Sequence, residues 1–157
     1  AIGMTNRVHG DWVVVVDGVM GGRSSGEAAE TTEGLVFSGT LSLENNGGFS
    51  SIRRNLDGPP EGRSGVRLWL RGDGRSYQFR LRPNRDGDGV AWRAPFATNG
   101  AWQEIEVGFD AFEPVFRGRA VPQAGAIDPG EIGQIGFMIA DRQPGPFTLE
   151  VRRIEFY

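Results

Sequence analysis

Two glutamates, Glu104 and Glu106, have a spacing that could support hydrolysis of a sugar bond. If their segment forms a strand, they share one face beside Trp102, about 6 to 7 Å apart. Glycoside hydrolases work with a pair of carboxyl groups that flank the bond. However, nothing around these residues in the sequence would raise the pKa of one of them, and neighbouring carboxylates on an exposed strand are usually surface charge. We therefore predict no catalytic role for the pair.

The residue types that the chain lacks exclude much of enzyme chemistry. It has 157 residues with no cysteine, and all 17 basic residues are arginine. Thiolate catalysis, disulfides, cysteine-based zinc sites and Schiff bases are therefore excluded. The single histidine, His9, would have to carry any catalytic triad or histidine metal site alone. We predict a protein that is not an enzyme and needs no cofactor, and its net charge of -3 gives no general attraction to nucleic acid.

A glycine-rich stretch at residues 17–26 (DGVMGGRSSG) follows an apolar run and is a candidate phosphate-binding loop. A Walker loop ends in Gly-Lys-Ser or Gly-Lys-Thr, and the chain has no lysine. The dinucleotide-binding fingerprint needs the spacing G-x-G-x-x-G, which these glycines lack. We therefore interpret the stretch as a structural corner, with a loop presented to a partner as the alternative.

A second loop at residues 84–92 (NRDGDGVAW) begins like a calcium-binding loop. Val90 and Ala97 stand where the EF-hand pattern needs oxygen ligands, so that pattern fails. A looser calcium site built from backbone carbonyls and Asp86 or Asp88 stays open as an alternative. We favour a solvated hairpin loop and predict no metal site.

Apolar and polar residues alternate through most of the chain, which is the pattern of half-buried strands. Each run is bounded by Gly, Pro, Asn or Asp, and no apolar run is long enough to cross a membrane. The clearest runs are 35–43, 66–70, 77–81, 105–109 and 135–139. The pattern predicts an all-β sandwich or barrel.

One hairpin can be placed with its register. The sequence LRGDGRSY puts Asp73 and Gly74 where a two-residue turn needs residues that tolerate positive φ. Leu70 would then oppose Tyr77, and the apolar residues would match across the pair. The opposite face of this hairpin would carry Arg67, Trp69, Arg71, Gln78, Arg80 and Arg82.

We predict that this arginine and tryptophan face binds a ligand or a partner. Both residue types are enriched where partners bind, and forked guanidinium groups suit acidic or sugar-like ligands. Two alternatives stay open. Glu104 or Glu106 could neutralise the arginines within the chain, and the segment 120–126 could cover Trp69.

Two smaller features follow from the local pattern. The parity of the apolar residues changes between Val151 and Ile154, so a β-bulge is expected at 152–153. A short helical turn is expected from Asp128, which can cap it, with Pro129 at its first position.

Five longer motifs occur in order along the chain. They are DGVMGGRSSG (17–26), FSGTLSLENNGGFSSIR (37–53), LRGDGRSYQFRLR (70–82), WQEIEVGFDAFEPVFRGR (102–119) and IGQIGFMIADRQPGPFTLEVRRIEFY (132–157). On these motifs the chain, over residues 12–157, resembles the complex I intermediate-associated protein 30 family. The resemblance implies a galactose-binding-like jelly-roll sandwich. Mitochondrial members of that family assist assembly of NADH:ubiquinone oxidoreductase, and others are free-standing domains or domains attached to dehydrogenase-like folds.

The glycine-rich stretch and the turn at 45–48 are interpreted together as a structural corner. Its glycines would allow positive φ and close approach of chain segments, and Met20 would fill a gap between the sheets. Asp17 and Ser24 would bond to exposed backbone groups. The predicted corner residues are Asp17, Met20, Gly21, Gly22, Ser24, Asn45, Asn46, Gly47 and Gly48.

These observations predict one domain over residues 1–157, with 1–10 as a loose N-terminal segment. We expect a non-enzymatic, assembly-factor-like or chaperone module with protein partners, and the resemblance alone implies respiratory-complex subunits. The alternative is a carbohydrate-binding module that uses Trp69 and its arginine neighbours. We expect a cytoplasmic protein, peripheral to membrane complexes, with neither membrane insertion nor a nucleic-acid partner.

Overall fold

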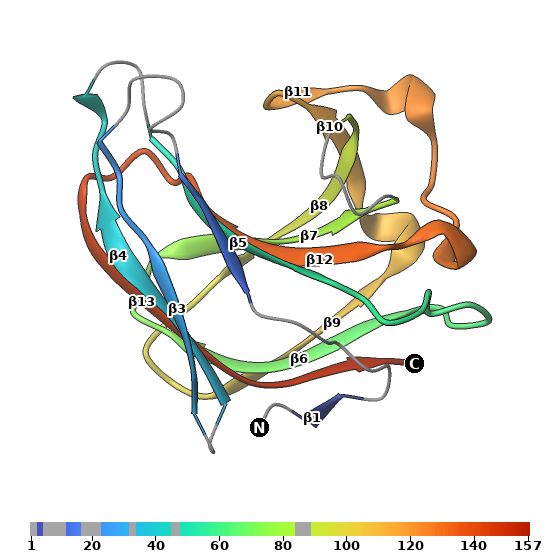
Figure 1. Ribbon diagram of the computed structural model, residues 1–157, viewed down its shortest axis with the longest axis horizontal. Coiled ribbons are helices and arrows are strands. Elements are labelled where there is room, and N and C mark those ends of the chain that lie inside the picture. The colour runs from blue at the N-terminus through green and yellow to red at the C-terminus, as the bar shows by residue number, and fades with distance from the viewer. Residues whose placement is uncertain (1–2, 5–11, 17–22, 32–33, 45–47, 84–88) are drawn as a thin grey trace.

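The alternating apolar residues form two β-sheets that enclose a common hydrophobic core (Figure 1). The computed structural model describes residues 3–4, 12–16, 23–31, 34–44, 48–83 and 89–157. Within these residues the strands pair in antiparallel fashion, except that β1 (Gly3–Met4) runs parallel to β13 (Gly145–Phe156). The predicted all-β sandwich is confirmed, and this part of the chain contains no α-helix.

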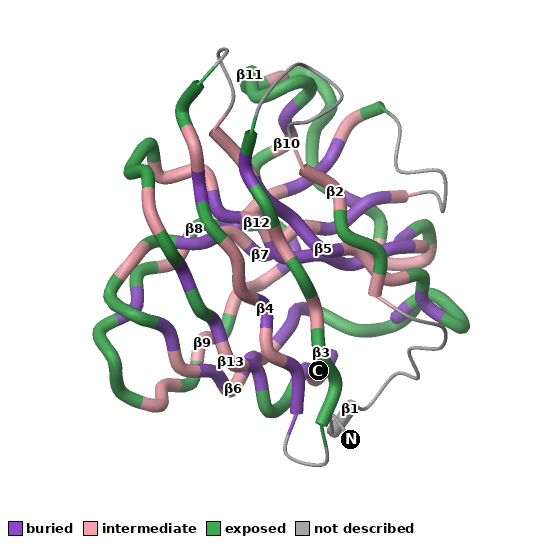
Figure 2. The backbone as a smooth tube through the Cα atoms, turned by 60° about the vertical axis from the view of Figure 1, so that its left-hand side comes forward, coloured by how far each residue is buried: buried purple, intermediate pink, exposed green. Residues whose placement is uncertain are grey.

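One sheet has six strands among the described residues and is called the six-stranded sheet. Strand β13 lies at its centre. Its order is β3-β4-β13-β6-β9, with β1 pairing with β13 off this path. Buried and more exposed residues alternate along β13 and β6, as Figure 2 shows, because one face of the sheet meets the core. The remaining strands are β3 (Glu27–Thr31), β4 (Gly34–Leu41), β6 (Gly65–Gly72) and β9 (Gln103–Gly108).

The other sheet has seven strands among the described residues and is called the seven-stranded sheet. Its order is β11-β10-β8-β7-β12-β5-β2. Its interior strand β12 is buried at nearly every position, which a sheet with one solvated face does not predict (Figure 2). Something must therefore shield the outer face as well. The strands are β2 (Val13–Val16), β5 (Ser50–Asn55), β7 (Ser76–Arg82), β8 (Ala91–Ala97), β10 (Glu113–Phe116), β11 (Arg119–Ala120) and β12 (Gln134–Ile139).

Aromatic rings from both sheets fill the core. The rings of Phe79 and Phe137 meet edge to face, with 5.1 Å between their centroids. Tyr77 of β7 contacts Phe147 of β13 across the sandwich at 6.4 Å between centroids. Such pairs stabilise a core by about 0.5 to 1.5 kcal/mol beyond the area that they bury. They also fix which residues of β7 point inward, and hence which point outward.

The predicted hairpin at Asp73 and Gly74 is wrong. β6 belongs to the six-stranded sheet and β7 to the seven-stranded sheet, so the chain crosses from one sheet to the other at this turn. β6 pairs with β9 and β13, whereas β7 pairs with β8 and β12. Gly74 does have a positive φ, of 94°. A turn that accommodates positive φ is compatible with either a hairpin or a crossover. The turn residues alone therefore do not predict which strands pair.

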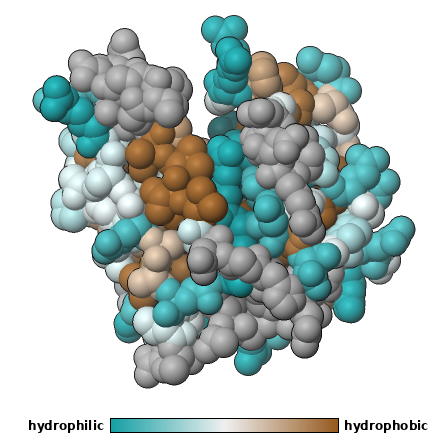
Figure 3. All heavy atoms as spheres, viewed as in Figure 1, coloured by the Kyte–Doolittle hydropathy of each residue, from teal (hydrophilic) through white to brown (hydrophobic). Residues whose placement is uncertain are grey.

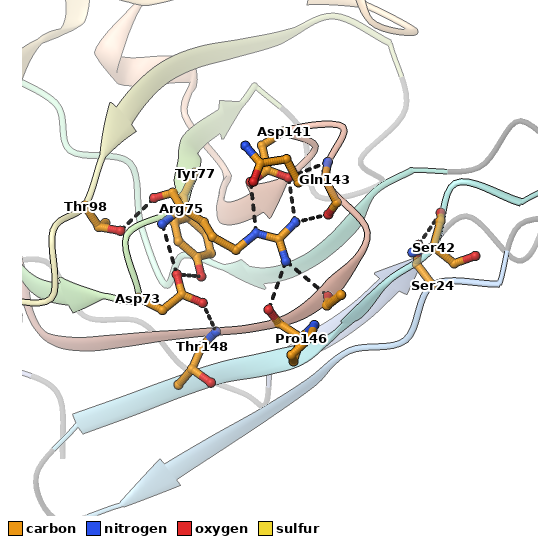
Figure 4. A network of polar contacts seen from close by, with 11 residues as sticks. Ser24, Ser42, Asp73, Arg75, Tyr77, Thr98, Asp141, Gln143, Pro146 and Thr148 are labelled. Atoms are coloured by element: carbon orange, nitrogen blue, oxygen red, sulfur yellow. Dashed lines mark hydrogen bonds and ion pairs between the residues drawn. The ribbon is translucent and has the colours of Figure 1, made fainter.

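A polar cluster, the crossover clasp, holds this connection in place of hairpin hydrogen bonds (Figure 4). The Asp73 carboxylate accepts hydrogen bonds from the Tyr77 hydroxyl and from the Thr148 backbone N–H, both at 2.8 Å. Arg75 donates to both carboxylate oxygens of Asp141, at 2.9 and 2.7 Å. The clasp therefore ties the crossover to the segment that leads into β13.

Charge and burial keep the clasp in one protonation state. Burial alone would raise the pKa of Asp141, but the hydrogen bonds from Arg75 lower it, so Asp141 is ionised at neutral pH. Burial raises the pKa of the Tyr77 hydroxyl, which stays a donor. Arg75 also donates to the backbone carbonyls of Gly145 and Pro146, at 3.1 and 2.9 Å.

The two smaller sequence predictions are confirmed. The register between β13 and β6 shifts between Val151 and Arg153, which is the expected bulge. A 3₁₀ turn, η5 (Pro129–Glu131), follows Asp128, whose side chain accepts from the Gly130 N–H at 2.9 Å. Two further 3₁₀ turns are η3 (Phe109–Ala111) and η4 (Pro122–Ala124).

Candidate functional site

The six residues predicted to share one binding face lie on two different faces. Because β6 and β7 belong to different sheets, the residues that alternate with their buried positions point away from the core in different directions. Arg67, Trp69 and Arg71 lie on the outer face of the six-stranded sheet, and Gln78, Arg80 and Arg82 lie on the outer face of the seven-stranded sheet. The predicted single face is therefore corrected to two.

The tryptophan face is the outer surface of β6, β9 and β13, and it is built from stacked planar groups. The rings of Trp69 and Trp102 stack with 6.1 Å between centroids and 18° between planes. The guanidinium carbons of Arg71 and Arg152 lie 4.9 and 4.3 Å from the Trp102 ring centroid. These cation–π contacts occupy the surface of Trp102 from within the chain.

The charges of the tryptophan face are also matched within the chain. Nε of Arg67 lies 3.0 Å from a carboxylate oxygen of Glu104 and 3.1 Å from one of Glu106. The hydrogen bond to Glu106 raises the pKa of Arg67. Arg71 pairs with Glu150 at 2.6 Å. The alternative in which carboxylates of the chain neutralise these arginines is thus what the structure has, and Glu104 and Glu106 are ion-pair acceptors.

The segment 120–126, whose position over Trp69 was the second alternative, does not form that cover. It lies instead over Trp92, whose Nε1 donates to the backbone carbonyl of Gly125 at 2.9 Å. Trp69 is half-buried by the stack with Trp102.

The outer face of the seven-stranded sheet carries a row of arginines. Backbone pairing aligns Arg53 of β5, Gly136 of β12, Arg80 of β7 and Arg93 of β8. Around this row lies the arginine recess, a small hollow that is partly open to solvent. Its outward-facing lining residues are Ser51, Arg53, Arg80, Arg82, Gln134, Gly136 and Met138.

The recess explains why the centre of this sheet is buried on both faces. Arg82 is 8% exposed, Gln134 7% and Ser51 2%, although all three lie on the side away from the core. The space-filling view shows the surface hollowed near its upper edge, with hydrophilic atoms in the hollow (Figure 3). Polar groups at its floor therefore sit in a medium less polar than bulk water, where a charge interacts more strongly.

Arg80 has no carboxylate partner in the described part of the chain. Its Nη1 donates to Oε1 of Gln78 at 2.8 Å and lies 3.6 Å from Sδ of Met138. Its Nε is buried without a hydrogen-bond partner. Burial, followed by repulsion from neighbouring arginines, above all Arg82, lowers the pKa of Arg80 to about 10. The guanidinium is still protonated at neutral pH, so the recess contains a shielded cation that is costly to leave unpaired.

The far end of the row differs from its centre. Nε and Nη2 of Arg93 lie 2.9 and 2.8 Å from one carboxylate oxygen of Glu113, on β10. The carboxylate that pairs with Arg93 therefore lies at the edge of the row.

Gly136 is required at the floor of the recess. A Cβ at this position would lie 2.7 Å from the backbone oxygen of Ile52, closer than side chains approach a backbone atom. Glycine therefore lets β5 and β12 pair closely. It also leaves the space between Arg53 and Arg80 free of a side chain.

Sequence reasoning missed Arg53, Gln134 and Gly136 as parts of a site. Alternation would have placed Arg53 outward, beside the buried Ile52. Nothing local, however, indicates that β5 lies next to β12 and β12 next to β7, since these pairings join distant segments.

Most of the predicted corner lies outside the described residues: Asp17, Met20, Gly21, Gly22, Asn45, Asn46 and Gly47. Of the others, Gly48 has a φ of 143°. The hydroxyl of Ser24 accepts from the Ser42 N–H at 2.9 Å and donates to the Ser42 carbonyl at 3.2 Å (Figure 4). Ser24 thus joins the start of β3 to the end of β4.

No group of three or more His, Cys, Asp or Glu residues within the described ranges could hold a metal ion. Asp86 and Asp88, the candidates for a loose calcium site, lie outside those ranges. Over the same part of the chain, no helix has the length and apolar character needed to cross a membrane.

The chain thus has a jelly-roll-like sandwich in which the outer face of one sheet is recessed. The sequence profile of the family described as complex I intermediate-associated protein 30 matches residues 4–151. The chain therefore belongs to this family.

Two curated relatives support this assignment. The mouse mitochondrial complex I intermediate-associated protein 30 is 27% identical over 163 residues, covering 89% of this chain and 50% of that protein. A probable mitochondrial counterpart from Caenorhabditis elegans is 32% identical over 95 residues, covering 57% of this chain and 28% of that protein. The chain thus spans at most about half the length of these relatives. Their mitochondrial location is a property of those proteins, and the cytoplasmic location expected here stays a prediction.

Solved structures with a similar fold include carbohydrate-binding modules. A family 11 module of the Clostridium thermocellum cellulase Lic26A-Cel5E has a TM-score of 0.67 and 19% identity, covering 96% of this chain and 92% of that one. The family 11 module from the same organism in complex with a mixed-linked tetrasaccharide has a TM-score of 0.66 and 18% identity, covering 89% and 85%. At these identities the likeness establishes the galactose-binding-like sandwich fold alone.

Proposed function

We propose that this chain is a non-enzymatic, assembly-factor-like module that binds a protein partner, a subunit or intermediate of respiratory complex I, through the arginine recess. Membership of the complex I intermediate-associated protein 30 family supports the kind of partner. The observation that carries the choice of surface is Arg80, a shielded cation without a carboxylate partner in the described residues. Such a group is stabilised when a partner supplies the missing anion.

The carbohydrate alternative has less support from these residues. Sugar-binding modules need an aromatic surface for a sugar ring to stack on. On the tryptophan face, Trp102 is already stacked on Trp69 and covered by guanidinium groups. Among the described lining residues of the recess, the aromatic Phe137 is fully buried against Phe79.

The test is affinity capture from native lysate and solubilised membranes of cells that express the protein. The bait is the unaltered chain, Arg80→Gln or Arg71→Gln, and bound complex I subunits are quantified by mass spectrometry. We expect the unaltered chain and Arg71→Gln to enrich these subunits equally. Arg80→Gln should reduce the enrichment by at least about tenfold, because it removes a charge-assisted hydrogen bond.

Circular dichroism and thermal unfolding of all three proteins control for loss of the fold. Equal capture by Arg80→Gln, or capture without complex I subunits, would contradict the proposal. Affinity electrophoresis in mixed-linked β-glucan tests the alternative: retardation of the unaltered chain that Trp69→Ala abolishes would favour carbohydrate binding.

A further inference from the structure

We infer that the arginine recess contains a subsite for one carboxylate, the side chain of Asp or Glu in an acidic segment of the partner, bound side-on by Arg80. This inference deepens the proposed function, on which it rests, by naming the chemical group that the surface recognises.

The hydrogen bonds of Arg80 leave one particular edge of its guanidinium group unused. Nη1 is occupied by Gln78 and faces Met138. Nε has no partner, and no bond of Nη2 occurs in the described residues. The N–H groups of Nε and Nη2 point in parallel, and this edge binds both oxygens of a carboxylate in forked pairs. Gln78 therefore fixes the orientation of the group and leaves this edge without a hydrogen bond in the described residues, with Nε itself buried.

The dimensions of the recess suit a single small group. The recess is much smaller than the sites of about 300 to 1,000 Å³ that are typical for whole small molecules. Gly136 keeps its floor open, because a Cβ there would lie against the Ile52 carbonyl and 3.5 Å from the Arg53 side chain. A space of this size has room for one small group at its mouth, such as the carboxylate of an acidic side chain, and none for an oligosaccharide.

The surrounding charge favours an anion and discriminates against a cation. Arg93 pairs with Arg80 across β8 and β7, and Arg53 lies beyond Gly136 in the same row. Burial lowers the pKa of Arg80, and repulsion from Arg82, Arg53 and Arg93 lowers it further. The carboxylate of Glu113 is engaged by Arg93 at the edge of the row. Because the chain as a whole has a net charge of -3, attraction to an acidic partner must be local.

The test uses the full chain and a blocked hexaglutamate peptide, with blocked hexaglutamine as the uncharged control of the same length. Binding is followed by calorimetry and by the ¹H–¹⁵N resonance of the Arg80 Nε–H group. We expect hexaglutamate to shift this resonance saturably and hexaglutamine to leave it unchanged. Arg80→Gln should weaken hexaglutamate binding by about 10- to 100-fold, the range for a hydrogen bond to a charged group. The matched variant Arg71→Gln should bind as the unaltered chain does.

Arg80→Lys separates forked geometry from charge. It should bind hexaglutamate more weakly than the unaltered chain, and equal affinity would overturn the side-on arrangement. Inorganic phosphate is the second probe: saturation of the Arg80 resonance by phosphate at lower concentration than by hexaglutamate would overturn the carboxylate. The absence of any saturable shift, or equal weakening by Arg71→Gln, would overturn the subsite.

The inference and the proposed function can fail separately. If hexaglutamate does not bind but complex I capture still depends on Arg80, the carboxylate inference is wrong and the proposed function stands. If hexaglutamate binds at Arg80 but capture does not depend on Arg80, the subsite stands and the proposed function is wrong.

Discussion

The two outer faces of the sandwich use the same residue type in opposite settings. On the tryptophan face, Arg67 lies within 3.0 to 3.6 Å of carboxylate oxygens of Glu104, Glu106 and Glu155. In the arginine recess, Arg80 has a glutamine and a methionine sulfur for neighbours, and its Nε is unbonded. The number of arginines on a face is therefore a poor guide to function.

The two faces differ in the partners of one arginine each. Within the described residues, carboxylates lie beside Arg67 and none lies beside Arg80. Ion pairs at an exposed surface contribute little to stability and are weakened by salt. A shielded cation without an anionic partner lowers the stability of the fold. Such groups are found mostly where a ligand binds and supplies the opposite charge. Arg67 on the tryptophan face already has its carboxylate partners, and we propose that a bound partner supplies the carboxylate that Arg80 lacks among the described residues.

The largest expected effect comes from the clasp that keeps the two faces apart. Arg75→Gln should lower the free energy of unfolding by about 3 kcal/mol, because Asp141 is left buried without its cation. Urea unfolding at pH 7 measures this effect. At low pH the difference should shrink: the lowered pKa of Asp141 means that its contribution is lost as pH falls through that value. A variant as stable as the unaltered chain would show that the crossover is held by other contacts.

Filling the floor of the recess should have the next largest effect. Gly136→Ala places a Cβ against the Ile52 carbonyl, so we expect a loss of about 2 kcal/mol in the free energy of unfolding. The variant should also bind hexaglutamate more weakly, because the added methyl group lies against Arg53 at the floor of the recess. Thermal unfolding and calorimetry check the two effects. Unchanged stability would mean that β5 and β12 can separate at no cost.

Trp69→Ala sharpens the comparison from the other face. Loss of the stack with Trp102 should lower the free energy of unfolding by about 1.5 kcal/mol. Its affinity for hexaglutamate should not change, since the recess lies on the other sheet. Calorimetry of the folded variant provides the measurement, and a large loss of affinity would mean that the tryptophan face contributes to binding.

The smallest expected effect is on the free energy of unfolding when one arginine is removed from either face. The two faces should change in opposite directions. Arg80→Met should raise the free energy of unfolding by about 1 kcal/mol, because it replaces an unpaired shielded cation with an apolar side chain. Arg67→Met, at an exposed and paired position, should leave stability unchanged or slightly reduced. Parallel urea titrations compare the variants. Destabilisation by Arg80→Met would mean that the chain already satisfies Arg80.

The sequence predicts the fold well and the candidate site only in part. Alternation correctly identifies the inward residues Tyr77, Phe79 and Leu81, and therefore the outward Arg80. It cannot determine that β7 lies beside β12, because the turn at Gly74 satisfies its local requirement equally well in a hairpin or a crossover. The side chains that decide for a crossover, such as Asp141, come from a distant segment.

The local sequence also does not predict that Arg80 lacks a carboxylate partner in the described residues. From the sequence alone, glutamates such as Glu104 could pair with any of the arginines of the predicted face. Their position on the other sheet makes them available to Arg67 and not to Arg80. Which arginine is neutralised is a property of the tertiary arrangement.

The central place of β13 in the six-stranded sheet has a consequence for synthesis on the ribosome. β13 follows every other described strand in sequence, yet it separates β4 from β6 and pairs with both. Until residues 145–156 have emerged, the nascent chain holds two incomplete half-sheets whose unpaired edges invite association with other chains. The nascent chain therefore needs protection in the interval before β13 is released.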